Sequence, residues 1–355
     1  MRAFGLGTHI ASNNFKSVLL LAGFPVLLLL LMYALFLLYA GVAGDYGGAY
    51  AENGVASPFL WAANSLTHAW PFALGGAGAW FTVAYFSHQA LIDMSTGARE
   101  LTRKENGRVW NLLENLCISR GIPMPSLRVI DTPALNAFAS GLHEKQYSIT
   151  VTSGLLETLD DAELEGVLAH ELTHIKNHDV RLLVIAVIFV GIFSFVGEMT
   201  FRGLTNMRWS GGGGRSRSSS SSSSRDSGGG AIIAIVAALV MIAIAYALAI
   251  AIRFALSRRR EYLADAGAVE LTKNPDAMIS ALRKISGHAE VPRAPAEVRE
   301  MFIENTHVGI GEIFATHPPI EKRIAALVAF AGGLDLGAAP DGAPEFGKRK
   351  RGPWG

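Results

Sequence analysis

The residues best suited to chemistry are the two histidines and the glutamate of His170-Glu171-Leu172-Thr173-His174. On an α-helix, side chains four positions apart lie on one face. Both imidazoles therefore reach a single Zn²⁺ at about 2.0–2.1 Å. Glu171 lies beside the first histidine, where it would take a proton from a metal-activated water rather than bind the metal. The spacing predicts hydrolytic zinc chemistry; two unrelated helix histidines are the competing interpretation.

The surrounding sequence predicts the helix that this motif requires. Asp160 caps its start, and Glu163 completes a capping box. Apolar residues then recur at helical spacing, namely Leu164, Val167, Leu168, Leu172 and Ile175. The preceding segment 147–152 is rich in β-branched residues and ends before Gly154, which predicts a β-strand leading into the helix.

A catalytic zinc site needs a third protein ligand and an open position. His178 follows His174 by four residues, but on a continuous helix it lies about 12 Å along the axis from His170, at 1.5 Å per residue. No glycine bends the chain between His174 and His178. We therefore interpret His178 and Asp179 as a pair at the helix C-terminus, where the helix dipole favours histidine.

Glu261 is the better candidate for the third ligand. Asp265 follows it by one helical turn, so both carboxylates share a face. Glu261 would bind zinc while Asp265 orients a ligand histidine. Spacing alone leaves open a solvated helix end in which Glu261 pairs with Arg258.

The composition indicates a membrane protein. Half of the residues are hydrophobic, 17% are charged and the mean hydropathy is +0.30, whereas a soluble domain carries about 25% charged residues. This balance argues against a plain cytosolic enzyme and a disordered chain. The net charge of +1 provides no field that would attract nucleic acid. The single cysteine, Cys117, excludes a cysteine-based zinc cluster, so a metal site must use His, Asp and Glu.

Four apolar runs are candidates for membrane helices, at about 18–40, 69–92, 182–199 and 231–252. The first and last are long enough for a bilayer core of about 30 Å. The second carries polar residues near its end, and a buried core helix is the alternative there. The third is short, because Glu198 follows its last apolar residues.

Lysine and arginine predict the orientation of these runs. Basic residues follow the second and fourth runs, and residues 41–68 contain none. The positive-inside tendency places both basic segments, and the N-terminus, in the cytoplasm. The Gly/Ser-rich loop 203–230 conflicts, because it also carries arginines although four spans place it outside. Either the rule fails there, or the third and fourth runs enter as a hairpin without crossing. Both options keep Glu261 on the same membrane side as the histidines, which favours it as the third ligand.

The chain is thereby predicted to divide into five parts. A membrane region 1–94 is followed by the first polar segment 95–181, the membrane region 182–252 and the second polar segment 253–331. The two polar segments would form one globular part. The tail 332–355 is rich in Gly, Pro and Ala and ends in a basic cluster. We interpret it as a solvated, disordered tail; contact with a lipid surface is the alternative.

Three motifs in order carry a family resemblance: H-E-L-T-H at 170–174, R-R-R-E-Y-L-A-D at 258–265 and T-H-P-P at 316–319. With P-A-L-N-A-F-A at 133–139, they resemble the HtpX family of membrane zinc metallopeptidases, which is related to the CAAX prenyl endopeptidases. The resemblance covers most of the chain, up to about Ala331. It implies an α+β, mostly α fold with about four transmembrane helices and a gluzincin-like protease domain with a small β-sheet. It also implies a multi-pass protein of the bacterial inner membrane, with the active site facing the cytoplasm.

The resemblance implies roles for individual residues. One Zn²⁺ per chain would be held by His170, His174 and Glu261, with Glu171 as the general base. His317 would face the substrate carbonyl, although a turn residue before two prolines is the alternative. Arg323 would support the site. The segment beside the cleft would hold the substrate backbone; its residues are Asn136, Ala137, Phe138 and Ala139.

The chain is thus predicted to be a membrane zinc endopeptidase. An extended peptide would bind along a strand edge near 136–139 or 147–152, since an edge supplies backbone hydrogen bonds with little side-chain discrimination. The resemblance implies unfolded membrane proteins as substrates and a role in quality control. A narrower processing protease of the prenyl-endopeptidase kind is one alternative. A membrane scaffold with a structural zinc is another, but a structural site needs no base, and Glu171 is present.

Overall fold

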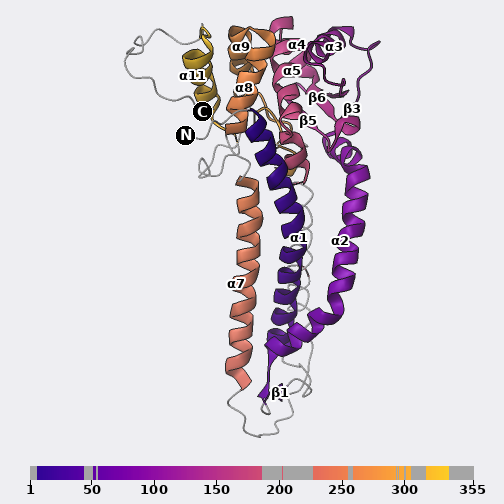
Figure 1. Ribbon diagram of the computed structural model, residues 1–355, viewed down its shortest axis with the longest axis vertical. Helices are drawn as coiled ribbons and strands as arrows, with labels where there is room; N and C mark the ends of the chain where they lie inside the picture. Colours follow the sequence, from indigo (N-terminus) through magenta and orange to yellow (C-terminus); the bar gives the residue numbers. More distant parts are fainter. Residues whose placement is uncertain are drawn as a thin grey trace. The chain divides into compact units, whose positions relative to one another are not determined.

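A computed structural model describes the chain over residues 6–43, 51–52, 55–185, 202, 227–254, 259–292, 294, 296–299, 301–304 and 317–335. The described residues are mostly helical and separate into two compact units (Figure 1). We call them the catalytic unit, which comprises Met1–Val18, Ala84–Val187 and Arg253–Gly355, and the apolar unit, which comprises Leu19–Val83 and Ile188–Ile252.

The apolar unit contains most of three long helices, α1 (Leu6–Ala43), α2 (Pro58–Thr96) and α7 (Ser227–Phe254). Their contact is built from leucines and alanines, because small residues let helices approach closely. The buried cluster consists of Leu37, Leu38, Ala62, Ala234 and Ala238. At Gly41 a β-carbon would come within 3.1 Å of the Ala231 carbonyl oxygen, so α1 and α7 need a glycine there. Two short strands, β1 (Ala51–Glu52) and β2 (Val55–Ala56), pair antiparallel.

Large apolar side chains lie on the outside of these helices, including Phe72 at 82% and Ile232 at 65% exposure. Among the described residues, one segment, Asn14–Val42 of α1, is long and apolar enough to cross a membrane by length and composition. The runs predicted at 69–92 and 231–252 lie within α2 and α7. The third run beyond residue 185, loop residues 203–226 and the tail beyond 335 lie outside the described residues.

The sheet of the catalytic unit has the strand order β3-β4-β6-β5, with β6 parallel to β4 and antiparallel to β5. Its strands are β3 (Arg99–Glu100), β4 (Ser126–Ile130), β5 (Ala137–Ser140) and β6 (Ser148–Thr152). The strand expected at 147–152 is therefore confirmed as β6. The expectation that its edge receives substrate is wrong, because β6 is paired on both sides.

Helices pack around the motif-bearing helix α5 (Asp161–Lys176), which contacts α3, α8, α9 and β5. Further helices of this unit include α3 (Gly107–Arg120), α4 (Ser153–Thr158), α8 (Arg259–Thr272), α9 (Pro275–Ile285), α10 (Ala296–Arg299) and α11 (Ile320–Ala331). One 3₁₀ turn, η2 (Glu144–Gln146), precedes β6. The helix at the centre of this unit therefore buries polar residues of the 170–174 motif as well as apolar side chains.

The start of α5 forms as its sequence predicts. The Asp160 side chain accepts from the Glu163 backbone N–H at 2.9 Å, and the Glu163 carboxylate accepts from the Asp160 N–H at 2.9 Å. The apolar residues expected on its inner face, Leu164, Val167, Leu168, Leu172 and Ile175, are all buried. The capping box and the helical spacing are therefore confirmed.

Close packing of α8 on α5 brings the two motifs together. A β-carbon at Gly267 would come to 2.7 Å from Thr173 Oγ1 and 3.1 Å from Thr173 Cβ. Only a glycine fits at this crossing, because any side chain would push the helices apart. The crossing lies two residues beyond Asp265 on the same helix, so this approach determines how near Glu261 comes to the histidines.

Candidate metal centre

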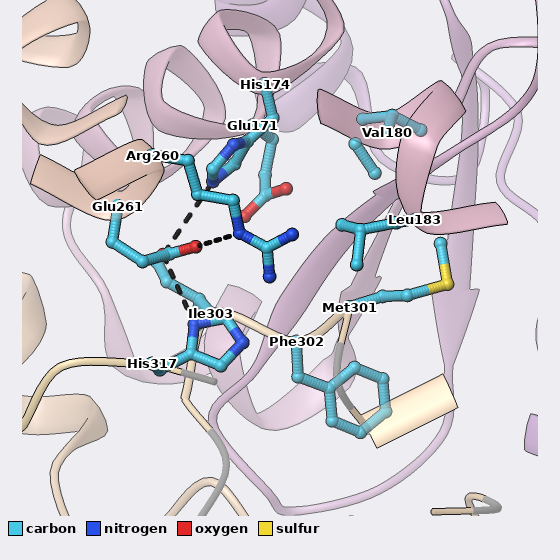
Figure 2. A pocket seen from close by; sticks show the side chains of 11 residues that line it. Glu171, His174, Val180, Leu183, Arg260, Glu261, Met301, Phe302, Ile303 and His317 are labelled. Carbon is cyan, nitrogen blue, oxygen red and sulfur yellow. Dashed lines mark hydrogen bonds and ion pairs between the residues drawn. The ribbon is translucent and has the colours of Figure 1, made fainter. Parts of the chain in front are cut away.

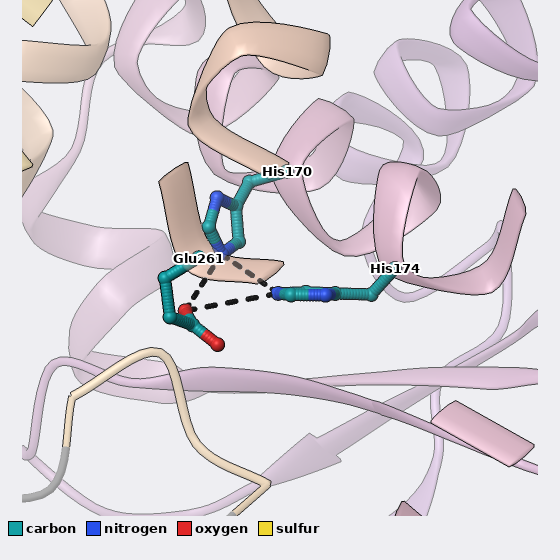
Figure 3. A group of neighbouring side chains, drawn as sticks. All are labelled: His170, His174 and Glu261. Carbon is teal, nitrogen blue, oxygen red and sulfur yellow. Dashed lines mark hydrogen bonds and ion pairs between the residues drawn. The ribbon is translucent and has the colours of Figure 1, made fainter. Parts of the chain in front are cut away.

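Three side chains from α5 and α8 converge on one point (Figure 3). His170 Nε2 lies 3.1 Å from His174 Nε2. Glu261 Oε2 lies 3.6 Å from the first nitrogen and 3.8 Å from the second. All three residues are buried. The structure therefore brings together the three residues that the sequence singles out as zinc ligands.

The separations fit a small divalent cation. Tetrahedral ligands at about 2.0–2.1 Å from Zn²⁺ lie roughly 3.3–3.4 Å from one another, and the observed distances bracket this value. Glu261 Oε2 is buried and has no hydrogen-bond partner in the described part of the chain. Basic nitrogens lie near this oxygen, with His317 Nδ1 at 3.3 Å and Arg323 Nη1 at 3.9 Å. A buried carboxylate is costly unless such positive groups or a cation compensate it. The donor set and the orphaned oxygen both fit a metal ion.

Each histidine is held from behind by a carboxylate. His170 Nδ1 lies 2.9 Å from Asp265 Oδ1, and His174 Nδ1 lies 3.0 Å from Asp179 Oδ2. Such contacts determine which ring nitrogen carries the proton and leave Nε2 free to bind metal. Asp265 lies where the sequence predicts an orienting carboxylate.

Sequence reasoning missed the contact of Asp179 with His174. It assumed one continuous helix through His178, but α5 ends at Lys176 and His178 adopts a left-handed conformation with φ 60°. This turn carries His178 to Asn14, whose Oδ1 lies 3.0 Å from its Nδ1, and returns Asp179 to the cluster. The expected C-terminal pair of His178 and Asp179 is therefore wrong.

Arg323 of α11 stabilises this arrangement from below. Its Nε donates to Asp265 Oδ2 at 2.9 Å, and one terminal nitrogen donates to Asp265 Oδ1 at 2.6 Å. The other terminal nitrogen donates to the Ile303 carbonyl at 2.9 Å. Such a planar two-point pair holds a carboxylate in one orientation. Arg323 thus orients Asp265, and it also lies 3.4 Å from His170 Nδ1 and 3.9 Å from Glu261 Oε2.

The electrostatics of the cluster favour a cation. Burial by itself would lower the pKa of His174, but Glu261 and Asp179 raise the pKa to about 10. Burial opposes ionisation of Glu261, yet the nearby His317 and His174 hold its pKa well below the usual range. A site that binds a proton this firmly at an imidazole also attracts a divalent cation.

Glu171 faces a pocket beside the cluster (Figure 2). Burial raises the pKa of Glu171 above its usual value. A raised pKa suits a group that must both accept and return a proton near neutrality. The pocket is lined by Ala139, Glu171, His174, Val180, Leu183, Arg260, Glu261, Met301, Phe302, Ile303 and His317.

His317 enters the same pocket from the segment ahead of α11. Its Nδ1 lies 3.3 Å from Glu261 Oε2. On the opposite oxygen, Glu261 Oε1 accepts from Arg260 Nε at 3.1 Å. The two oxygens of Glu261 therefore have different surroundings, and only Oε2 is directed at the histidines. Arg260 is a second residue that sequence reasoning did not single out.

The segment Asn136–Ala139 contributes less to the pocket than the resemblance implies. Asn136 is buried, and its amide donates to the carbonyls of Ala289 and Glu304 at 2.7 and 3.0 Å. Ala137 and Phe138 are also buried, and the Ala137 carbonyl accepts from the Ile303 N–H. Of the four residues, Ala139 alone lines the pocket. The Asn136 side chain is thus bonded to the chain's own Ala289, Ile303 and Glu304.

Comparisons with known proteins point to the same chemistry. A family model described as Peptidase family M48 matches residues 103–331. A protease HtpX homolog of Bacteroides fragilis (strain YCH46) is 45% identical over 340 residues, covering 93% of this chain and 100% of that protein. Another, of Tropheryma whipplei (strain Twist), is 38% identical over 259 residues, covering 72% and 84%. The crystal structure of S. mikatae Ste24p matches 90% of this chain and 66% of its own, at 19% identity and a TM-score of 0.43.

The family model and the two HtpX homologs define a class, the membrane zinc metalloproteases. The chain belongs to peptidase family M48. The resemblance to the HtpX family, drawn from the motifs at 170–174, 258–265 and 316–319, is thereby confirmed.

Proposed function

We propose that the protein is a gluzincin-type endopeptidase in which His170, His174 and Glu261 bind one Zn²⁺ and Glu171 is the general base. The observation that carries this proposal is the convergence of two Nε2 atoms and one orphaned carboxylate oxygen within 3.8 Å of one another. Glu171 opens onto the adjoining pocket. A closed structural site would have neither the base nor the open side.

The mechanism follows from the residues of the pocket. When bound, Zn²⁺ supplies Lewis acidity and lowers the pKa of a bound water towards about 7. Glu171 accepts a proton from the attacking water and later returns a proton to the leaving amine. His317 donates to the substrate carbonyl oxygen as negative charge develops there. Asp265 and Asp179 keep both imidazoles in the tautomer that leaves Nε2 unprotonated.

The substrate is an extended peptide that lies along β5 at Ala139, since the Ala137 carbonyl already accepts from the Ile303 N–H. This strand is at the edge of its sheet, and Ala139 belongs both to the strand and to the pocket. Backbone pairing at an edge accepts many sequences. This suits unfolded segments of membrane proteins, so we assign the enzyme to membrane protein quality control.

We further propose four membrane-spanning helices with the active site on the cytoplasmic side of a bacterial inner membrane. The apolar regions 1–94 and 182–252 would hold the spans, the polar segments 95–181 and 253–331 the protease domain, and 332–355 a tail. The exposed apolar side chains of α1, α2 and α7 support burial of these helices in lipid.

The decisive test is Glu171→Gln in the purified, zinc-loaded chain. Wild type should degrade an unfolded test protein until a chelator is added. The variant should retain about one zinc per chain and lose at least about 10²–10⁴-fold in rate, because general base catalysis contributes this much. Glu165→Gln, on the same helix but outside the pocket lining, is the matched control. Cleavage by Glu171→Gln at the wild-type rate would refute the assignment.

Membrane topology is tested by labelling with an impermeant maleimide. Burial raises the pKa of the Cys117 thiol to about 11, so the native cysteine gives little background. With four spans, Ser222→Cys reacts in intact cells and Glu100→Cys reacts only after lysis. Protection of both positions would instead show that the third and fourth runs form a hairpin that does not cross.

A further inference from the structure

Arg260 is an unusual arginine in the pocket. It lies in the first turn of α8, directly before Glu261, and its side chain is only 3% exposed. The guanidinium nevertheless lines the pocket with Glu171 and His317. Figure 2 shows the guanidinium extending from the Glu261 side towards the space beside Glu171. A buried cation in such a position needs a partner.

The chain provides only part of that partner. Arg260 Nε donates to Glu261 Oε1 at 3.1 Å. Both terminal nitrogens, Nη1 and Nη2, are buried and have no hydrogen-bond partner within the described ranges. Leaving charged donors unsatisfied inside a protein is costly, and native structures rarely do so without a reason. The pocket that Arg260 lines suggests the reason, because a ligand that enters this pocket would meet these atoms.

Arg323 shows what a structural arginine looks like in the same neighbourhood. It is also fully buried, but its three nitrogens donate to Asp265 and to the Ile303 carbonyl. Every nitrogen of Arg323 therefore already has a partner, whereas two nitrogens of Arg260 have none in the described part of the chain. Arg323 therefore stabilises the fold, whereas Arg260 has nitrogens that could bind a ligand.

A guanidinium offers donors only, so its missing partner must be an acceptor. A bound peptide presents carbonyl oxygens beside the bond that is cleaved. We propose that Nη1 and Nη2 of Arg260 bind an acyl oxygen of the substrate while Nε keeps Glu261 in place. The proposal rests on the peptidase function above. The oxygen belongs to a main-chain carbonyl or to a free C-terminal carboxylate, and experiment distinguishes the two.

The planar shape of arginine matters for this double role. Nε faces the metal-binding carboxylate while the two terminal nitrogens, fixed in the same plane, face the pocket. Lysine has a single ammonium and cannot occupy both positions in a fixed geometry. Arg260→Lys should therefore keep the charge but lose much of the substrate binding.

The test compares two short peptides of one sequence, one ending in a free carboxylate and one amidated. Each is cleaved by full-length, zinc-loaded wild type, Arg260→Gln and Arg260→Lys. Arg99→Gln, an exposed arginine outside the pocket lining, is the control. Hydrogen bonds to a charged group predict a loss of about ten- to a hundredfold in kcat/KM, mainly through KM. Zinc content should remain at the wild-type level.

Equal losses on both peptides identify a main-chain carbonyl, and a loss confined to the free acid identifies a carboxylate. Unchanged kcat/KM on both peptides overturns the proposal, as does a loss that follows zinc content. If wild type cleaves neither peptide nor the unfolded protein, the peptidase function itself fails. Peptide affinity of Glu171→Gln with and without Arg260→Lys provides a second measurement, because no turnover is needed. The double variant should bind at least about tenfold more weakly; equal affinity contradicts the proposal.

Discussion

The catalytic unit buries charged side chains, whereas the apolar unit exposes large hydrophobic ones. In the first, His170, Glu171, Asp265 and Arg323 lie at the centre of the packing. In the second, the buried cluster is made of leucine and alanine, and phenylalanine, isoleucine and valine face outwards. Each arrangement would be costly in the other unit. The two units therefore differ in the surroundings that their surfaces suit.

Physical cost explains the division. A buried charge is tolerated where partners or a metal compensate it, and the catalytic unit provides oppositely charged partners and three residues that could hold a metal ion. Exposed apolar surface is tolerated where the surroundings are themselves apolar. Inside lipid, helices gain little by hiding leucine, so close approach through small residues holds them together. Gly41 and Ala234 in the apolar unit illustrate this.

The largest expected effect comes from removing the buried charge that faces both histidines. Glu261→Ala should reduce zinc affinity by more than a hundredfold and abolish proteolysis, because even an outer partner of a metal ligand is worth about 10–100-fold. Zinc per chain, measured by mass spectrometry, checks this. Glu270→Ala, on the exposed side of the same helix, should keep its zinc. Full zinc occupancy in Glu261→Ala would mean that another residue is the third ligand.

The apolar unit is tested by placing a charge on its surface. Val236 of α7 is 54% exposed, and Ile118 of α3 in the catalytic unit is 73% exposed. If α7 faces lipid, Val236→Lys should cost about 2.5–3.5 kcal/mol and sharply reduce the amount of membrane-inserted protein. Ile118→Lys should change stability by less than about 0.5 kcal/mol. Equal tolerance at the two sites would break the comparison between the units.

A smaller effect is expected from the carboxylate behind His174. Asp179→Asn keeps the shape but removes the charge that determines the His174 tautomer. Zinc affinity should fall by about 10–100-fold, the usual range for such partners. Competition with a chromogenic chelator measures it, and Asp131→Asn, an exposed carboxylate on the same unit, serves as the control. Unaltered affinity would show that Asp179 plays no part in holding the ring.

The smallest effect concerns Glu304. Burial raises the pKa of its carboxyl group to about 7. Because the folded pKa exceeds the unfolded value of about 4.5, the folded state binds the extra proton. The contribution of this proton is complete below about pH 4.5 and is lost as pH rises towards 7. Because Glu304 is partly exposed, the loss in the free energy of unfolding should be only about 1–2 kcal/mol. Thermal midpoints between pH 5 and 8 should fall more steeply for wild type than for Glu304→Gln, with exposed Glu290→Gln as control; parallel curves would contradict this.

Several features follow from the sequence because they depend on short-range geometry. The HExxH spacing places two imidazoles on one face of any helix, and Asp160 with Glu163 can close a capping box without help from elsewhere. Asp265 shares a face with Glu261 for the same reason. Long apolar runs likewise become helices in α1 and α7.

Other features depend on contacts between distant parts of the chain. β6 lies inside its sheet because β4 and β5 pair with it on its two sides. A local sequence pattern does not predict which strands will be neighbours. The turn that returns Asp179 to His174 depends on a left-handed residue at His178. Asn136 has donors and acceptors suited to a substrate, yet they are used by the 289–304 segment.

The sequence by itself determined the chemistry of this protein: which residue types meet on a helix face, and that much of the chain is too apolar for water. The tertiary structure decided which partners complete that chemistry. In the folded chain, Asp179 contacts His174 and Arg323 binds Asp265. Two nitrogens of Arg260 have no partner in the described part of the chain. Close packing of α8 on α5 at Gly267 brings Glu261 near the histidines. Helical spacing acts over a few residues, whereas these choices depend on how α8 and α11 pack around α5.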